Sequence, residues 1–211
     1  MTRLTGCFTA LVTPMKAGNL LNAPIDYDVL KELIEYQIKG KVDGVLVSGC
    51  TGHSASLTEK EQAELFEKAV EFADGRVKVI IGDGSNCTRD AIRIAKKMEE
   101  VGAKIHLQIS PYQNKPTQEG LYQHYAHIAK AISGDLIIYN VPGRTGKNVE
   151  AETTIRLAKE FSNIVAVKEA SGNMVQIKKI IDETKELKHF SVLSGDDSLT
   201  LEVIKNGGKR V

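Results

Sequence analysis

The sequence predicts an α/β protein, a (β/α)8 TIM barrel, and three observations support this prediction. Short apolar segments rich in β-branched residues alternate with segments that have the period of an amphipathic helix. Strands that alternate with helices in this way form a parallel sheet. Seven such units follow one another at a spacing of about thirty residues, the size of a βαβ repeat, and residues 207–211 begin like an eighth. Eight units close into a barrel.

An open, doubly wound sheet has the same local pattern and stays as the alternative. Against it, neither a GxGxxG sequence nor a P-loop follows the first predicted strand. The chain stops where strand eight would begin. We therefore expect one TIM-barrel domain over residues 1–211 that is incomplete at its C-terminus, so that either the chain is truncated or something else covers the gap. An unclosed barrel exposes two strand edges.

The first three units are predicted from apolar runs and helix-capping signals. Their strands cover residues 6–12, 43–47 and 77–81, and their helices cover about residues 26–39, the segment after Thr58, and 88–101. Asp26 is a candidate N-cap. Thr58 and Glu61 have the spacing of a capping box. Gly102 follows the third helix, as a glycine at a helix C-terminus often does.

The remaining units follow the same pattern. Their strands cover residues 104–109, 136–139, 164–169 and 190–193, and their helices cover about residues 117–132, 150–161, 173–186 and 198–205. A Pro-Gly turn is expected within residues 140–145, after the fifth strand. The sixth strand, residues 164–169, is apolar almost to its end, as expected of a strand buried on both faces.

Composition excludes several classes of protein. Apolar residues make up 42% of the chain and charged residues 26%, and the formal net charge is +1. These values are typical of a globular protein and give no reason to expect nucleic acid or a membrane surface as a partner. The start of the chain lacks the features of a signal peptide, and the three cysteines do not suggest a disulfide framework. A cytoplasmic location is expected.

Lys168 is the first candidate for catalysis. Strand alternation predicts Ile164, Ala166 and Lys168 on one face of the sixth strand. Desolvation of an ammonium group lowers its pKa, so a neutral amine becomes available to form a Schiff base with a carbonyl substrate. The alternative is a lysine that extends to solvent or pairs with a carboxylate.

Three more candidates follow other strands, where the active site of a barrel lies. Cys50 and Thr51 stand in a glycine-flanked turn whose backbone N–H groups can hold a carboxylate. Tyr139 ends the fifth strand, where a phenol can exchange protons with a substrate. Arg144 can offer a bidentate contact to a carboxylate. The alternatives are an ordinary turn, a core tyrosine and a solvated arginine.

Several segments together carry a resemblance to a known family. They are residues 49–54 (Gly-Cys-Thr-Gly-His-Ser), 110–122, 139–145 (Tyr-Asn-Val-Pro-Gly-Arg-Thr), 167–170 (Val-Lys-Glu-Ala) and 193–197 (Leu-Ser-Gly-Asp-Asp). With these motifs the sequence resembles the dihydrodipicolinate synthase family, within the pyruvate-dependent class I aldolases, over essentially all of its length.

The resemblance implies a homotetrameric TIM barrel that acts without a metal or an organic cofactor. It implies that pyruvate, bound to Lys168 as a Schiff base, condenses with L-aspartate 4-semialdehyde in lysine and diaminopimelate biosynthesis. Thr51 would hold the pyruvate carboxylate, Tyr139 would relay protons and Arg144 would receive the carboxylate of the aldehyde. By the same resemblance, residues of a feedback-inhibition site for lysine would be Ser54, Ala55, Asn86, Asp90 and Tyr112.

The sequence departs from the family pattern at two positions. Cys50 stands where the family has a threonine, and a thiol is a weaker hydrogen-bonding group than a hydroxyl. Gln113 stands where the family has a second tyrosine, and an amide does not titrate as a phenol does. Two alternatives to the synthase therefore stay open. One is a catalytically impaired or truncated homologue that keeps a pyruvate-like site, and the other is a sister aldolase for sugar acids, such as N-acetylneuraminate lyase.

Overall fold

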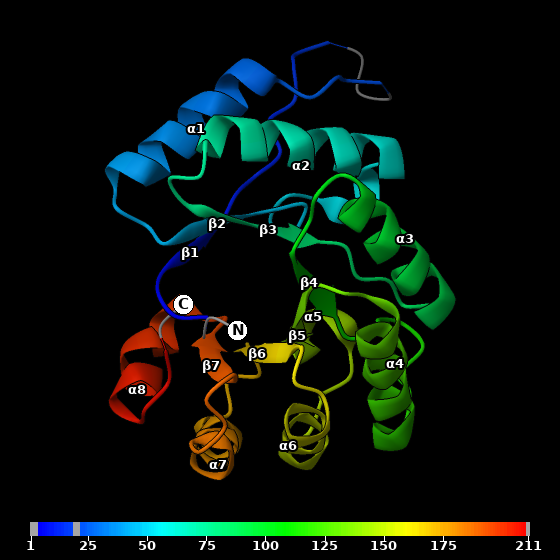
Figure 1. The fold of residues 1–211 in the computed structure, drawn as a ribbon, viewed down its shortest axis with the longest axis vertical. Coiled ribbons are helices and arrows are strands. Elements are labelled where there is room, and N and C mark those ends of the chain that lie inside the picture. The colour runs from blue at the N-terminus through cyan, green and yellow to red at the C-terminus, as the bar shows by residue number, and fades with distance from the viewer. Residues whose placement is uncertain (1–3, 19–21, 210–211) are drawn as a thin grey trace.

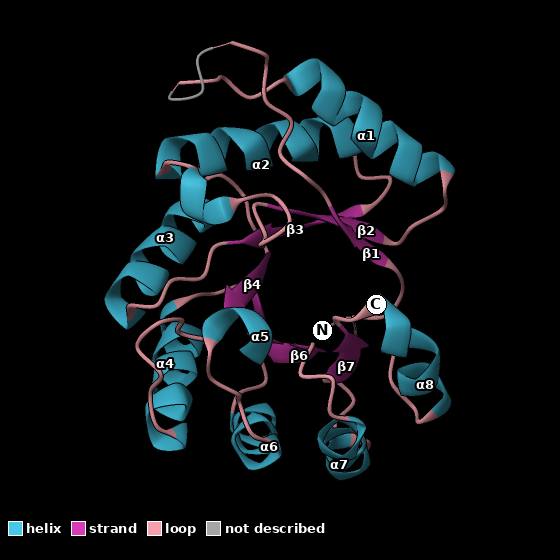
Figure 2. Cartoon of the chain, turned by 180° about the vertical axis from the view of Figure 1, so that it is seen from behind, coloured by secondary structure: helices cyan, strands magenta, loops and turns pink. Residues whose placement is uncertain are grey.

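The computed structural model describes residues 4–18 and 22–209 of the chain. These residues form one seven-stranded parallel sheet whose strands follow one another in sequence order, β1 to β7. The sheet curves around a central axis, and the helices lie on its outer side (Figures 1 and 2). This architecture confirms the predicted TIM-barrel class and rules out the doubly wound alternative, whose strand order reverses at a switch point.

The elements agree closely with the predicted ones. The strands are β1 (Phe8–Ala10), β2 (Gly44–Val47), β3 (Lys78–Gly82), β4 (Ile105–Ile109), β5 (Asp135–Asn140), β6 (Ile164–Glu169) and β7 (Ser191–Ser194). The helices are α1 (Tyr27–Lys39), α2 (Glu59–Ala73), α3 (Thr88–Glu100), α4 (Gln118–Ala131), α5 (Pro142–Thr145), α6 (Ala151–Glu160), α7 (Met174–Thr184) and α8 (Thr200–Lys205). Short 3-10 turns cover η1 (Ser54–Ser56) and η2 (Asp197–Leu199).

The predicted capping groups are confirmed. The Asp26 side chain accepts a hydrogen bond from the backbone N–H of Val29 and caps α1. Thr58 and Glu61 form the reciprocal bonds of a capping box at the start of α2. Gly102 follows α3 with a φ of +94°, a conformation that glycine adopts without strain.

The segments after β5 and β7 contain more detail than was predicted for them. The turn expected within residues 140–145 contains a single helical turn, α5, because Pro142 stands at its first position, where a missing N–H does no harm. The helix expected over residues 198–205 is divided into η2 and α8. Asp196 accepts hydrogen bonds from Ser198 and so begins the 3-10 turn before the α-helix starts.

The end of the described chain contacts both edges of the sheet. The backbone N–H of Lys209 donates to the carbonyl of Val192 on β7 (2.9 Å), and the carbonyl of Lys209 accepts from the N–H of Gly6, just before β1 (3.2 Å). Lys209 therefore lies in the place that a strand between β7 and β1 occupies. Of the residues predicted to begin the eighth strand, Arg210 and Val211 lie outside the described residues.

The strand that carries Lys168 corrects one prediction. The pairing of β5 with β6 runs from Leu136↔Ile164 to Ile137↔Ala166, which leaves Val165 as the extra residue of a bulge. Val165 and Ala166 both pack inside the barrel, whereas Ile164 packs outside, against the helices. Ala166 shares its face with Lys168 as predicted, but Ile164 does not, because simple alternation cannot include a bulge.

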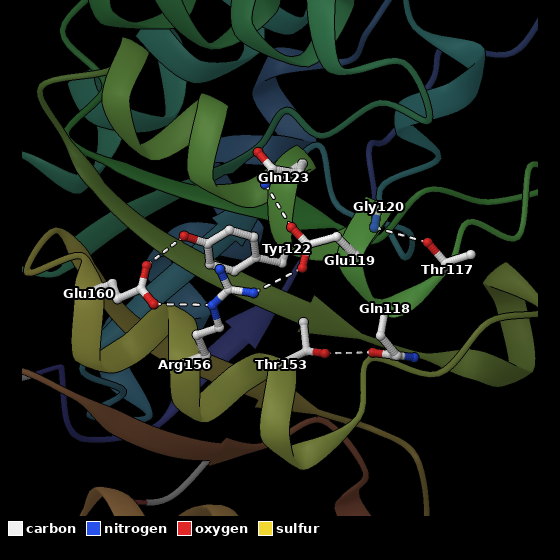
Figure 3. Close-up of polar contacts among 9 residues, drawn as sticks. All are labelled: Thr117, Gln118, Glu119, Gly120, Tyr122, Gln123, Thr153, Arg156 and Glu160. Atoms are coloured by element: carbon white, nitrogen blue, oxygen red, sulfur yellow. Dashed lines mark hydrogen bonds and ion pairs between the residues drawn. The ribbon is translucent and has the colours of Figure 1, made fainter.

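The outer layer is joined by side-chain contacts between α4 and α6 (Figure 3). Arg156 donates to Glu119 (2.9 Å), Tyr122 donates to Glu160 (2.5 Å) and Thr153 donates to Gln118 (2.7 Å). The Arg156 guanidinium also lies 3.4 Å from the centre of the Tyr122 ring. No helix among residues 4–18 and 22–209 is long and apolar enough to cross a membrane.

The burial of α1 allows a matched test of the core. Leu30 is fully buried on this helix, whereas Tyr36 is 72% exposed on it. We expect Leu30→Ala to lower the free energy of unfolding by about 2–5 kcal/mol, since it leaves a cavity. Tyr36→Ala should change it by no more than about 0.5 kcal/mol. Urea unfolding followed by circular dichroism measures both, and equal losses would contradict this description of the core.

Candidate active site

A cavity of about 580 Å³ opens at the carboxyl ends of β2, β3, β4 and β5. Its wall combines backbone from glycine-rich turns with polar side chains from several loops. Among the residues that line it are Ser48, Gly49, Cys50, Gly82, Gly84, Tyr112, Tyr139 and Arg144. The structure therefore brings Cys50, Tyr139 and Arg144 into one cavity, although 94 positions of sequence separate the first from the last.

Lys168 is not among the residues that line this cavity, but it neighbours Tyr139, which does line it. Tyr139 and Lys168 are register partners on adjacent strands, and the Lys168 Nζ lies 4.7 Å from the centre of the Tyr139 ring. Lys168 also borders a small void of about 30 Å³ inside the barrel, together with Leu107, which lines the large cavity as well. Lys168 is thus between the apolar barrel interior and the polar cavity.

The surroundings of Lys168 favour its neutral form. Burial lowers the pKa of Lys168, and the positive charge of Arg144 acts in the same direction. The Cys50 thiol and the Asp197 carboxylate oppose this effect but do not reverse it. A neutral amine is therefore available below the pH at which an ordinary lysine loses its proton, as a nucleophile for carbonyl addition requires.

Tyr139 is placed to act as a hydrogen-bond donor. Its side chain is 6% exposed, and burial, with the Cys50 thiol as a second cause, raises the pKa of Tyr139 to about 12. The phenol therefore keeps its proton at neutral pH. When a neutral amine has added to a carbonyl carbon, the oxygen on that carbon must leave as water. A protonated phenol beside the amine can donate the proton that this oxygen needs.

The turn after β2 is held close to its neighbours by glycines. A side chain at Gly82 would place its Cβ 2.4 Å from the Ser48 carbonyl, and one at Gly52 would place it 3.2 Å from the Ser48 N–H. Cys50 is half-buried and lines the cavity. Thr51 is exposed and is not among the residues that line the cavity, so the predicted pair is only partly brought together.

Arg144 stands at the rim. It belongs to the single turn of α5, which ends at Gly146 with a φ of +72°. The guanidinium is exposed, so it keeps its charge and can approach an anion that enters from solvent. The role predicted for Arg144, receiving the carboxylate of the aldehyde, stays a prediction.

Three of the five residues predicted for feedback inhibition line the same cavity. Ser54, Ala55 and Tyr112 line it. The Asn86 amide donates to the Tyr112 carbonyl (3.3 Å), whereas Asp90 lies on α3 and pairs with Arg93 (3.6 Å). Only part of this set therefore faces the cavity, and its role stays a prediction.

Sequence reasoning missed Ser48. This residue is fully buried, lines the cavity and has a φ of +53°, and its Oγ has no hydrogen-bond partner among the described residues. A left-handed conformation at a serine cannot be read from the sequence, although the following Gly49 indicates a sharp turn. Within residues 4–18 and 22–209 no cluster of His, Cys, Asp and Glu side chains is arranged to hold a metal ion.

Comparison with known proteins identifies the family. Residues 3–211 match the sequence model of the dihydrodipicolinate synthetase family. The chain belongs to this family. The resemblance inferred from the sequence motifs is therefore confirmed.

Individual relatives agree. The chain is 47% identical to the 4-hydroxy-tetrahydrodipicolinate synthase of Bacillus subtilis, over 96% of this chain and 68% of the relative. The crystal structure of dihydrodipicolinate synthase from Aquifex aeolicus matches with a TM-score of 0.91 and 44% identity, over 99% of this chain and 69% of that one. The enzyme from Cyanidioschyzon merolae, solved with lysine bound, matches with a TM-score of 0.91 and 42% identity, over 97% and 68%.

The environment of Lys168 predicts an unusual titration. We expect trace acetylation of Lys168 by acetic anhydride, followed by mass spectrometry, to have its midpoint below the ordinary lysine pKa of 10.5, because burial favours the neutral amine. Lys168→Met, which removes the acetylation site, identifies the signal. A midpoint at or above 10.5 would show that the amine is solvated.

Proposed function

We propose that this chain condenses pyruvate, bound to Lys168 as an imine, with L-aspartate 4-semialdehyde, as the synthases of lysine and diaminopimelate biosynthesis do. The observation that carries the proposal is the desolvated Lys168 amine, 4.7 Å from the Tyr139 ring and beside a cavity that also presents Cys50 and Arg144. Family membership and relatives named for this reaction support it. The chain is accordingly a Schiff-base-forming enzyme of the lyase class.

The first half of the reaction forms a nucleophile from pyruvate. The neutral Lys168 amine adds to the pyruvate carbonyl, and the resulting carbinolamine loses water as Tyr139 donates a proton to the departing oxygen. Backbone N–H groups of the turn at Cys50, which lines the cavity, hold the carboxylate. Loss of a proton from the pyruvate methyl group then converts the imine into an enamine, with the protonated imine nitrogen as the electron sink.

The second half forms the new carbon–carbon bond. The enamine carbon attacks the aldehyde carbon of L-aspartate 4-semialdehyde, and the aldehyde oxygen takes up a proton. Arg144 orients this substrate through its carboxylate. The substrate amine then adds to the imine carbon and displaces the Lys168 amine, which closes the heterocycle and restores the free enzyme.

The imine is the step to test first. Incubation with pyruvate and sodium borohydride should add the mass of a reduced pyruvate imine to the peptide that contains Lys168, because the amine is neutral and accessible. Lys168→Met should abolish the adduct, and Lys188→Met, which changes an exposed lysine, should not. A folded protein that acquires no adduct on Lys168 would refute the proposed function.

Cys50 provides a second test, since a thiol at this position favours the catalytically impaired alternative. We expect Cys50→Thr to raise turnover, up to roughly 10²-fold, because a hydroxyl relays protons better than a thiol. Cys7→Thr, at an exposed cysteine, is the matched control and should have no effect. Unchanged turnover in Cys50→Thr would show that the thiol does not limit the reaction.

Gln113→Tyr tests the other departure from the family pattern. Turnover with a panel of aldehydes separates the synthase from a sugar-acid aldolase.

Other expectations stay predictions. They are assembly as a homotetramer, feedback inhibition by lysine, a cytoplasmic location, and a single domain over residues 1–211. A relative solved with lysine bound supports the second of them. Analytical ultracentrifugation measures the first, and turnover in the presence of lysine measures the second.

A further inference from the structure

Glu169 is a buried carboxylate immediately after the reactive lysine. It is the last residue of β6 and 1% exposed, and it lies on the opposite face of the strand from Lys168. The proposed reaction does not use it. A buried acidic side chain is costly unless hydrogen bonds or a charge compensate it, so its partners indicate what it does.

The partners of Glu169 are hydrogen-bond donors. The Asn140 amide donates to both carboxylate oxygens (2.9 and 3.0 Å), the Gln176 amide donates to one (3.0 Å) and the backbone N–H of Ser171 donates to the other (2.8 Å). An ionised carboxylate only accepts, so this arrangement suits the charged form. A glutamine in its place would direct its own N–H groups at these donors.

The donors are themselves held. The Asn140 oxygen accepts from the Val149 N–H (2.9 Å), and the side chain of Asn148 bridges the amides of Asn140 and Gln176 (2.8 Å to each). The cluster therefore joins the end of β5, the end of β6, the segment before α6 and the first turn of α7. We call Asn140, Asn148, Glu169 and Gln176 the amide–carboxylate cluster.

The cluster stands behind the reactive pair. Asn140 and Glu169 are register partners, and the pair one step earlier on the same strands is Tyr139 and Lys168. Backbone hydrogen bonds also join these strand ends. The N–H of Ala170 donates to the Asn140 carbonyl (2.8 Å), and the N–H of Gly195 donates to the Glu169 carbonyl (2.7 Å). Gly195 lies so close that a Cβ on it would be 3.1 Å from the Lys168 Cγ.

We propose that Glu169 is a positioning residue that, through Asn140 and Gln176, holds the Lys168 amine in its desolvated place over the Tyr139 ring. Adjacent residues of one strand project to opposite sides, so fixing the outer side chain fixes the backbone from which the inner one projects. If the cluster loosens, β6 can shift against β5 and Gly195, and the amine gains water. The effect of this shift on turnover rests on the proposed function, but its effect on the hydration of the Lys168 amine does not.

The test is the titration of Lys168 in Glu169→Gln, measured by trace acetylation from about pH 6 to 11. Hydration favours the ammonium form, so we expect acetylation at pH 7.5 to fall roughly three- to tenfold, as a pKa rise of about half a unit to one unit produces. The deficit should disappear once the pH exceeds the midpoint of the variant. The ionisable groups that face Lys168, namely Cys50, Asp197 and Arg144, are unchanged in this variant.

A milder variant keeps the test decisive if Glu169→Gln does not fold. Gln176→Met removes one donor from the cluster and lies on half-exposed α7 surface, and it should produce a smaller shift in the same direction. Glu160→Gln is the matched control, because Glu160 also accepts from two side chains, those of Tyr122 and Arg156, but on the outer layer (Figure 3). It should leave the titration of Lys168 unchanged.

Two results would overturn the proposal. The first is a Lys168 titration that is the same as in the wild type, measured in folded Glu169→Gln, or in Gln176→Met if only that variant folds. It would show that Glu169 only stabilises the fold. A deficit that stays equally large above the midpoint of the variant would show that access of the reagent has changed rather than hydration of the amine. The titration uses acetic anhydride and needs no pyruvate. Failure of borohydride trapping would therefore refute the proposed function but would leave this test valid.

Discussion

Burial withdraws most of the Lys168 side chain from water at the end of an otherwise buried strand, and the rest of the site depends on that constraint. Desolvation destabilises an ammonium group, so the surroundings must both exclude water and avoid a carboxylate close enough to restore the charge. The Tyr139 ring covers one side of the amine, and Gly195 lets the lysine stem pass close to its backbone. Asp197 acts against the effect without reversing it. The nucleophile is therefore a property of the packing around it.

The barrel supplies this packing because parallel neighbours place successive catalytic groups at one end of the sheet. Tyr139 and Lys168 are register partners, so the pairing of β5 with β6 sets their separation. The bulge at Val165 belongs to the same pairing. Bulges increase the local twist and redirect side chains, and this one fills the barrel interior with two consecutive residues below Lys168.

The proposed reaction divides into two parts that this chain treats differently. Carbonyl addition depends on Lys168 and Tyr139, whose surroundings suit it. Movement of protons around the imine depends on hydroxyl groups, and here the chain carries a thiol at Cys50 and an exposed amide at Gln113. Ser48 also lines the cavity that Cys50 lines. Its buried Oγ has no hydrogen-bond partner among the described residues.

The sequence by itself determined the class of fold, the order of its elements, the helix caps at Asp26 and Thr58, and Lys168, Tyr139 and Arg144 as candidates. These features depend on local periodicity, on short-range capping and on the position of a residue at a strand end. Tertiary structure alone decided which face Ile164 takes, that Thr51 lies outside the cavity lining, and that Glu169 is held behind the lysine. The physical reason is that register, bulges and buried polar contacts join residues far apart in the chain, and no local pattern records them.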